Sequence, residues 1–430
     1  MLNRKSAPPI HEVRNLVLPN PQVVRLDNGI PVYVLDFAGQ EIVKIEAVFR
    51  AGRPEEDKRL VARATSRLLR EGTTCRTAAE IAELIDFYGG SLSVPTNLDT
   101  ANFLLFSLKK YAAELIPVFA EVLQEPVFPE TELETFKQTS VQELLVELEK
   151  VEVLAYRKIT ELIFGENHPY GYNSTPDDYA ALERADLQRF FEKWYTPSNC
   201  LLFASGRVDD EILKLLNQHF GQNKQTEKMP GSQPAQPSQL SQPAQLSQPA
   251  QLQLSHPGSL QTAIKIGRRT FNRRHPDFNG LFVLNTILGG YFGSRLMMNI
   301  REKKGFTYNI YSTLDAYLHD GCLYIATEVN PQKTAATLKA IYLEMKNLRE
   351  KPVSHDELAM VRNYLLGMLL NGLDGPLNTS DLVRSLISEG LTHEAFDQLV
   401  ATIRNITPAQ LQELARRYLR PEDFWIVTVG

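Results

Sequence analysis

The stretch ADLQRFFEKWYTPSNCLLFASG (185–206) recurs without a gap as AQLQELARRYLRPEDFWIVTVG (409–430). The two copies share an alanine, a Leu-Gln pair, a proline and the final glycine at equal positions. Each copy predicts a helix, a turn marked by proline and then a buried strand. A duplication is the economical explanation, and two unrelated helix–turn–strand units are the alternative. The repeat therefore favours two similar domains within the 430 residues.

A segment of different composition, NKQTEKMPGSQPAQPSQLSQPAQLSQPAQLQLSHPGS (223–259), lies between the two copies. It repeats Ser-Gln-Pro-Ala-Gln and has almost no apolar side chains to bury, so we expect a flexible, partly extended linker. The predicted organisation is an N-terminal extension (1–20), a first domain (21–222), this linker and a second domain (260–430).

Hydrophobic periodicity predicts an α+β fold in both halves. VVRLDNGIPVYVLD (23–36) contains the Asp-Asn-Gly turn of a β-hairpin, and EIVKIEAVFRAG (41–52) alternates like a half-buried strand. Further strands are expected near 91–108, 261–269, 307–315 and 321–329. Helices are expected at 56–71, 78–88, 110–124, 130–164, 276–288, 293–302, 333–349 and 355–371. Strands that come in hairpins and helices that come in runs fit α+β better than a doubly wound parallel sheet.

Composition excludes several functional classes. The net charge is −5, and no basic run or RNA-reading motif supports nucleic-acid binding. No apolar stretch follows the first basic residues, and no window is apolar enough for a membrane helix, so neither a secretory signal nor a membrane segment is expected. Cys75, Cys200 and Cys322 lack CxxC spacing, which favours reduced thiols and a cytoplasmic location.

Common catalytic motifs are also missing. No two of the eight histidines stand four residues apart, as two zinc ligands on one helix would. The sequence has no G-x-x-x-x-G-K-[ST] phosphate loop and no G-x-S-x-G nucleophile elbow. A conventional zinc, nucleotide or serine-hydrolase site is therefore not predicted.

The helix predicted at LVARATSRLLREGT (60–73) carries an unusual polar stripe. Arg63, Ser66 and Arg67 are neighbours at i, i+3 and i+4, so two like charges stand one turn apart. Taken alone, this stripe fits a solvated helix face.

The order of motifs along the chain gives the stripe a second interpretation. LDNGIPVYV, VFRAGRPEED, LVARATSRLLREGT and TAAEIAELIDFYGGSLSV are followed by PVFPETELETFKQTSVQEL and NHPYGYNSTPDDYAAL, and later by LNTILGGYFGSRLMMNIREKKGFTYNIYS. This series resembles the pitrilysin/insulinase-type metallopeptidases (inverzincins), specifically the short bacterial and mitochondrial-processing type. The resemblance covers nearly the whole chain except 1–20 and the linker. It implies two homologous domains, each a mostly antiparallel sheet covered by helices.

In that family the opening helix carries His-x-x-Glu-His, whose histidines bind zinc and whose glutamate activates the metal-bound water. The resemblance places Arg63 and Arg67 at the histidine positions and Ser66 at the glutamate position. Arginine has no lone pair for a metal, and serine without a base cannot replace the carboxylate. The third ligand position falls on Glu143, which is either a lone acid on a solvated face or the ion-pair partner of Arg63 or Arg67. No metal or other cofactor is therefore expected on this chain.

The second half matches the family's Arg/Tyr motif in REKKGFTYNIY, where the resemblance assigns Arg301 and Tyr308 to stabilising the substrate carbonyl. An ordinary turn with a surface arginine and a core tyrosine is the alternative. Ser93 and Val94 stand where the family pairs its peptide substrate but usually has Asn-Ala.

These features together predict a catalytically inactive subunit. Its expected partner is a sister chain that carries zinc on His-x-x-Glu-His, and its expected substrate is a peptide enclosed between the two halves. A homodimeric peptide-binding or assembly scaffold without an enzymatic partner is the alternative. A peptidase with another metal or nucleophile is disfavoured, because no residues for it stand out.

Overall fold

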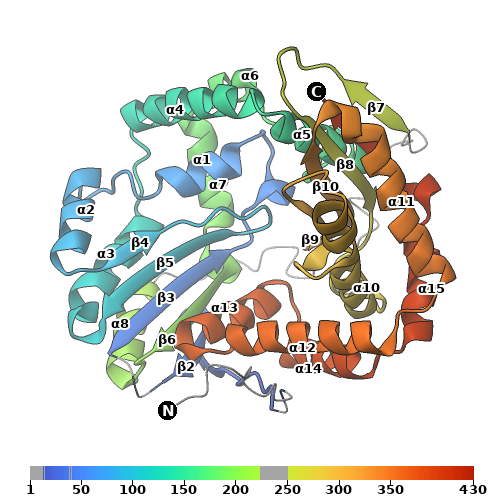
Figure 1. Cartoon of the computed structure of the whole chain (residues 1–430). Coiled ribbons are helices and arrows are strands. Elements are labelled where there is room, and N and C mark those ends of the chain that lie inside the picture. The colour runs from blue at the N-terminus through green and yellow to red at the C-terminus, as the bar shows by residue number, and fades with distance from the viewer. Residues whose placement is uncertain (1–12, 14, 38, 40, 223–249) are drawn as a thin grey trace, which may run out of the picture.

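The computed structural model describes residues 13, 15–37, 39, 41–222 and 250–430, which form two sheets surrounded by helices (Figure 1). The first sheet has the order β1-β2-β6-β3-β5-β4 and the second has the order β7-β11-β8-β10-β9. Their strands are β1 (Gln22–Arg25), β2 (Pro31–Asp36), β3 (Ile42–Phe49), β4 (Ser91–Ser93), β5 (Ala101–Leu108), β6 (Cys200–Gly206), β7 (Gln251–Leu254), β8 (Thr262–Arg269), β9 (Ile310–Ala316), β10 (Gly321–Val329) and β11 (Trp425–Val429). All pairs are antiparallel except β2–β6 and β7–β11.

The described part of the chain has eight α-helices in the first half and six in the second. They are α1 (Val61–Leu68), α2 (Ala78–Phe87), α3 (Ala112–Gln124), α4 (Glu130–Leu148), α5 (Val151–Phe164), α6 (Pro176–Ala180), α7 (Arg184–Trp194) and α8 (Asp210–Phe220), then α10 (Phe278–Asn285), α11 (Thr334–Glu350), α12 (His355–Gly372), α13 (Gly375–Ser388), α14 (His393–Asn405) and α15 (Pro408–Tyr418). Two π-helical turns, Thr286–Gly290 and Met297–Lys303, follow α10. No helix in the described part of the chain has both the length and the apolar character needed to cross a bilayer.

The predicted duplication and the α+β fold class are confirmed. The two copies of the opening repeat form α7–β6 and α15–β11, each with a short 3₁₀ turn at its proline. β6 pairs in parallel with β2 and antiparallel with β3, and β11 does the same with β7 and β8. The two domains therefore share one five-stranded topology, to which the first domain adds β1 beside β2.

Several predicted boundaries differ from the structure. The helix expected at 130–164 is broken between α4 and α5, and the strand expected near 91–108 is two strands. The apolar pattern runs through the first break, which contains no proline, whereas the second break contains Pro95. The region 293–302 becomes largely π-helical, and α13 and α14 were not predicted.

Two further differences concern the predicted domain limits. β7 lies inside the predicted linker, where it forms the edge of the second sheet. Leu16 and Leu18, expected in an extension outside both domains, are buried in the second domain's core. The rest of the linker, residues 223–249, lies outside the described residues, and the domain limits otherwise remain predictions.

The two domains exchange helices. α5 follows the first domain's α4 but packs on β8 and β11 of the second sheet, while α13 packs on β6 and β2 of the first (Figure 1). Ala155, Ile159 and Ile163 of α5 share a buried cluster with Ala263 and Val427 of the second sheet. Each sheet therefore has one face covered by a helix from the other half of the chain.

Buried charges of the first sheet hold α13 in place. Lys44 and Glu46 of β3 are each only 1% exposed. Lys44 Nζ lies 2.6 Å from Asp381 Oδ1, and Arg384 Nε lies 3.1 Å from Glu46 Oε1. Burial raises the pKa of Glu46, and the charges of Arg384 and Lys44 oppose this rise. The sequence pattern predicted a half-buried strand with these two residues on its exposed face. In the structure α13 covers that face and buries them.

Candidate functional site

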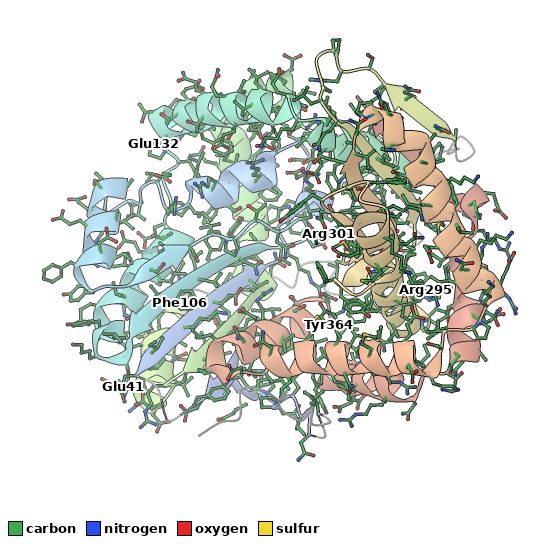
Figure 2. The ribbon with its side chains drawn as sticks, in the orientation of Figure 1. Glu41, Phe106, Glu132, Arg295, Arg301 and Tyr364 are labelled. Atoms are coloured by element: carbon green, nitrogen blue, oxygen red, sulfur yellow. The ribbon has the colours of Figure 1, made fainter. Side chains whose placement is uncertain are left out.

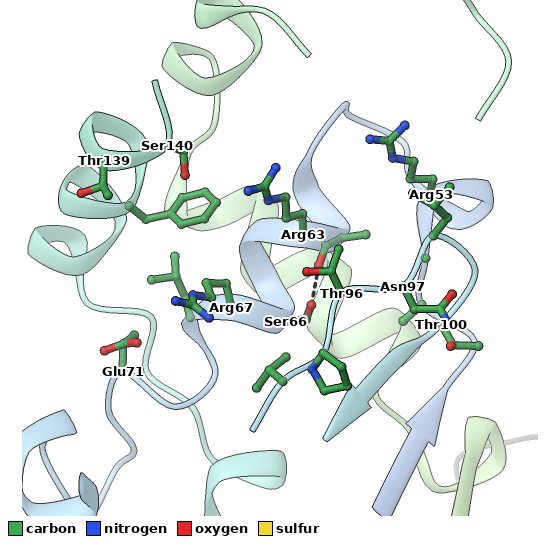
Figure 3. A pocket seen from close by; sticks show the side chains of 18 of the residues that line it. Arg53, Arg63, Ser66, Arg67, Glu71, Thr96, Asn97, Thr100, Thr139 and Ser140 are labelled. Atoms are coloured by element: carbon green, nitrogen blue, oxygen red, sulfur yellow. Dashed lines mark hydrogen bonds between the residues drawn. The ribbon is translucent and has the colours of Figure 1, made fainter. Parts of the chain in front are cut away.

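A cavity of about 530 Å³ lies in the first domain between α1, α4 and the segment that follows β4 (Figure 3). α1 contributes Arg63, Ser66 and Arg67, and α4 contributes Glu143 among others. The four residues that the sequence assigned to a degenerate metal site therefore line one cavity.

The sequence of α1 explains why its polar stripe faces this cavity. Val61, Ala64 and Leu68 are buried in the first domain's core, so the opposite side of the helix remains open. Figure 3 shows the side chains of Arg63 and Arg67 leaving α1 into the cavity, with Thr139 and Ser140 of α4 across from them.

Each polar residue of α1 has a different set of contacts. Arg63 Nη1 donates a hydrogen bond to the hydroxyl of Tyr179 at 3.2 Å. Ser66 Oγ donates to the carbonyl of Ala62 at 3.1 Å, a bond within the helix that leaves Ser66 without a base. Arg67 is exposed in the cavity.

The predicted ion pair between Glu143 and an arginine of α1 is wrong. Glu143 is exposed, and among the ion pairs of the described residues none joins it to Arg63 or Arg67. Since all three side chains are in contact with solvent, pairing would gain little and would restrict two long side chains. The two walls of the cavity therefore carry opposite charges that do not meet.

The side chains present do not fit a zinc ion. Guanidinium groups offer no lone pair, and the Ser66 hydroxyl donates its hydrogen bond to a backbone carbonyl, so Glu143 is the one ordinary zinc ligand of the four. No group of three or more His, Cys, Asp or Glu side chains in the described ranges has the arrangement needed to hold a metal.

Ser93 and Val94 lie at the end of the first sheet's edge strand. β4 pairs with β5, with Ser93 opposite Leu104, and it is the outermost strand of the sheet. Val94 follows it directly and lines the cavity. An added strand along β4 would therefore run beside the cavity.

Arg301 and Tyr308 are brought together in the second domain. The Arg301 guanidinium lies 5.0 Å from the centre of the Tyr308 ring and 4.8 Å from that of Phe292. Tyr308 is 86% exposed, in contrast to the core tyrosine of the alternative interpretation. Figure 2 shows Arg301 on the side of its domain that faces the first domain. Neither residue lines the cavity at α1.

A cluster of partly buried acids beside the cavity was not predicted. Glu56 accepts a hydrogen bond from the hydroxyl of Tyr172 at 2.6 Å, and the Arg53 guanidinium stacks on the same ring at 4.3 Å. Burial raises the pKa of both Glu55 and Glu56 to about 7. In the sequence, GRPEED resembles an exposed charged turn, and no local signal indicates its burial.

Asp99 joins the two domains next to this cluster. Its carboxylate accepts the hydroxyl of Tyr170 and, at 2.8 Å, the backbone N–H of Leu318 in the second domain. Burial raises the pKa of Asp99, while both hydrogen bonds oppose the rise. The segment that borders the cavity is therefore also a point of contact between the domains.

Comparison with known proteins agrees with this architecture. Residues 38–167 match the family model described as insulinase (peptidase family M16), and residues 181–365 match the one described as the peptidase M16 inactive domain. An uncharacterized zinc protease of Mycobacterium tuberculosis is 26% identical over 356 residues, which cover 82% of this chain and 80% of the relative. One from Bacillus subtilis is 23% identical over 365 residues, which cover 84% and 85%.

Solved structures share the fold. A peptidase M16 inactive domain from Pseudomonas fluorescens superimposes with a TM-score of 0.82 at 21% identity, over 96% of this chain and 98% of the other. A protease from Helicobacter pylori gives a TM-score of 0.86 at 17% identity, over 96% and 100%. With two models of one family matching successive parts of the chain and the shared two-domain fold, the protein belongs to the pitrilysin/insulinase (M16) peptidase family.

Proposed function

We propose that this chain is a catalytically inactive subunit of a zinc metallopeptidase, which pairs with a zinc-bearing sister chain of the same family. One observation carries the proposal: Arg63, Ser66 and Arg67 line the cavity. The family motif places two zinc ligands and a general base at these three positions. Arginine stays protonated in proteins, so neither guanidinium can act as a ligand or as a base.

The role proposed for the second domain is to assist the sister chain's site. Arg301 and Tyr308 supply a fixed positive charge and a phenolic O–H donor, which together suit an oxygen atom that gains negative charge. The Arg301 guanidinium lies against the rings of Phe292 and Tyr308. Tyr308 is exposed, so its hydroxyl could contact a bound peptide.

Coexpression with a sister chain that carries His-x-x-Glu-His tests this proposal. We expect peptide hydrolysis and about one zinc per pair, with the metal on the sister chain. Arg301→Ala should lower kcat/KM of the pair by roughly 10²- to 10³-fold, as loss of an oxyanion donor does. Lys303→Ala, an exposed change on the same π-helical turn, is the matched control and should have little effect.

Zinc-dependent hydrolysis by the purified chain alone would overturn the proposal. So would a fully active pair in which Arg301→Ala has the kcat/KM of the control. A chain that forms only homodimers, and neither binds nor activates any sister chain, would instead support the scaffold function.

Restoration of the motif tests whether α1 occupies the place of the family's metal-binding helix. The triple variant Arg63→His, Ser66→Glu, Arg67→His should bind about one zinc per chain, because Glu143 lines the same cavity as a third ligand. Adding Glu143→Gln to the triple variant should weaken zinc binding. A triple variant that gains no zinc would contradict the assignment of the cavity.

A further inference from the structure

We propose that Arg63 and Arg67 form a binding site for a carboxylate, specifically for an acidic side chain of a peptide that lies along β4. This inference rests on the peptide-binding part of the proposed function and adds a substrate preference to it. The two arginines would then do more than prevent zinc binding. They would form a positively charged binding site at the position that the family motif assigns to the metal.

Arg63 and Arg67 are close enough along α1 for their long side chains to reach one anion. Residues four apart on a helix have Cβ atoms roughly 5–6 Å from each other, which is within the reach of one carboxylate for two long side chains. Both arginines are exposed and line the cavity. Among the described residues, no carboxylate lies within ion-pair distance of either, since Glu71 at the cavity's edge pairs with Arg70.

A bound anion would remove an unfavourable interaction. Like charges at i and i+4 destabilise a helix roughly as much as opposite charges there stabilise it. The Tyr179 hydroxyl bonded to Arg63 is neutral and does not offset the repulsion. A carboxylate between the arginines would accept charge-assisted hydrogen bonds from both, and guanidinium geometry suits such bidentate contacts.

The opposite wall determines where the carboxylate would lie. Glu132 and Glu143 line the cavity from α4 and repel an anion, so the acidic side chain belongs at α1. Thr96 and Asn97, from the segment after β4, add neutral hydrogen-bonding groups to the cavity lining and lie on the side of α1 away from α4 in Figure 3. The α4 wall therefore carries the two glutamates, and the α1 wall carries Arg63 and Arg67.

The edge strand identifies the anion as part of a peptide. β4 is the outermost strand, and its free edge can add an extended chain through backbone hydrogen bonds. Val94 follows β4 and lines the cavity, so a peptide on this edge would pass the cavity. Alternate side chains of a strand point to one face, and one of them would enter the cavity toward Arg63 and Arg67.

Peptide binding to the purified chain, without a sister chain, tests the inference. The probes are short fluorescent peptides of alternating Ser and Val with an amidated C-terminus and either Glu or Gln at the centre. Fluorescence anisotropy should show about 2- to 30-fold tighter binding of the Glu peptide, as expected for a carboxylate that pairs with two exposed guanidinium groups. A Gln peptide with a free C-terminus distinguishes a terminal carboxylate from a side chain.

Variants locate the preference. The double variant Arg63→Gln, Arg67→Gln should abolish the preference for the Glu peptide over the Gln peptide. Because both side chains are exposed, the double variant should have nearly the same thermal midpoint as the wild type. Glu132→Gln, on the opposite wall, is the control and should retain the preference.

The outcomes separate this inference from the proposed function. Equal affinity for the Glu and Gln peptides, or a preference that survives the double variant, would overturn the carboxylate site and leave peptide binding intact. Tight binding of only the free C-terminus would replace the side-chain ligand with a terminal one and would also overturn it. Failure of every peptide to bind would overturn both the site and the peptide-binding role.

Discussion

The contact between α13 and the first sheet predicts that Arg384→Met will strongly destabilise the protein. Arg384 lies 3.1 Å from Glu46, whose carboxylate is almost fully buried on β3. Methionine keeps much of the side chain's volume but removes its charge. The substitution therefore leaves a buried carboxylate with one cation fewer.

The size of the effect follows from what remains around Glu46. Removal of one partner of a buried ion pair typically costs about 3–5 kcal/mol. Here Lys44 stays 3.5 Å from the carboxylate and Asn102 still donates a hydrogen bond at 3.1 Å, so we expect a loss near the lower end, about 3 kcal/mol. Lys346→Met, which breaks an exposed pair with Glu350 on α11, should change stability by less than about 0.5 kcal/mol.

The loss should also depend on pH. Burial already raises the pKa of Glu46, and removal of Arg384 takes away the largest opposing charge, so the variant's carboxyl protonates at higher pH. A raised pKa in the folded state means that stability is lost as the pH rises through that pKa. The destabilisation by Arg384→Met should therefore be greatest near pH 8 and should shrink toward pH 5.

Urea unfolding followed by tryptophan fluorescence measures these changes. Trp194 on α7 and Trp425 on β11 are the only two tryptophans, one in each domain, so both domains are monitored. A double-mutant cycle of Arg384→Met with Glu46→Gln should give a coupling energy of about 1–3 kcal/mol. Additive effects, or a loss no larger than that of the Lys346→Met control at pH 8, would refute the reasoning.

Three further predictions concern the region around the cavity. The wild-type thermal midpoint should fall between pH 5.5 and 8, because the Glu56 carboxyl has a pKa of about 7 in the folded protein and becomes charged inside the fold above that pH. Glu56→Gln should make this fall smaller. An unchanged dependence of the midpoint on pH would contradict this prediction. Gly52→Ala should lower the midpoint, since its Cβ would meet the Leu98 carbonyl oxygen at 2.3 Å, whereas Gly367→Ala on α12, with open space around it, should not lower it. Asp99→Asn should cost about 1–3 kcal/mol in urea unfolding by weakening the contact between the domains, and wild-type stability would refute that role.

Much of the fold could be predicted because it is repeated. The helix, proline turn and strand of the opening repeat occupy the same place in both sheets, and the hairpin turn at 26–30 has its glycine, Gly29, at a φ of 88°. The exchange of α5 and α13 was not predictable from periodicity, which shows which face of an element is apolar but not which domain covers it. Lys44 and Glu46 illustrate this, because their alternation resembles a solvent-facing edge while they are buried.

The sequence brought together the residues of one cavity, whereas their role at a degenerate metal site stays a prediction and one predicted contact was wrong. Arg63, Ser66, Arg67 and Glu143 line one cavity, as their alignment with the family motif implies. Sequence spacing carries no information on the distance between side chains of separate helices, so the ion pair was wrong. The partial burial of Glu56 was missed because it depends on segments more than a hundred residues away, including Tyr172.

The helix exchange has a consequence for the evolutionary origin of the chain. α5 is the third α-helix after β5, and α13 is the third α-helix after β10, so the two helices are equivalent in the duplicated halves. An ancestor with one such half would therefore cover this sheet face only by exchanging the helix with a second copy of itself. Fusion of the two copies makes that pairing intramolecular and frees the two sides to diverge. Glu46 and Lys265 record such a divergence: both lie opposite matching positions of the repeat, yet one pairs with Arg384 of α13 and the other with Glu152 of α5. A symmetric dimer would carry the same charge at both places, and the fused gene carries opposite ones.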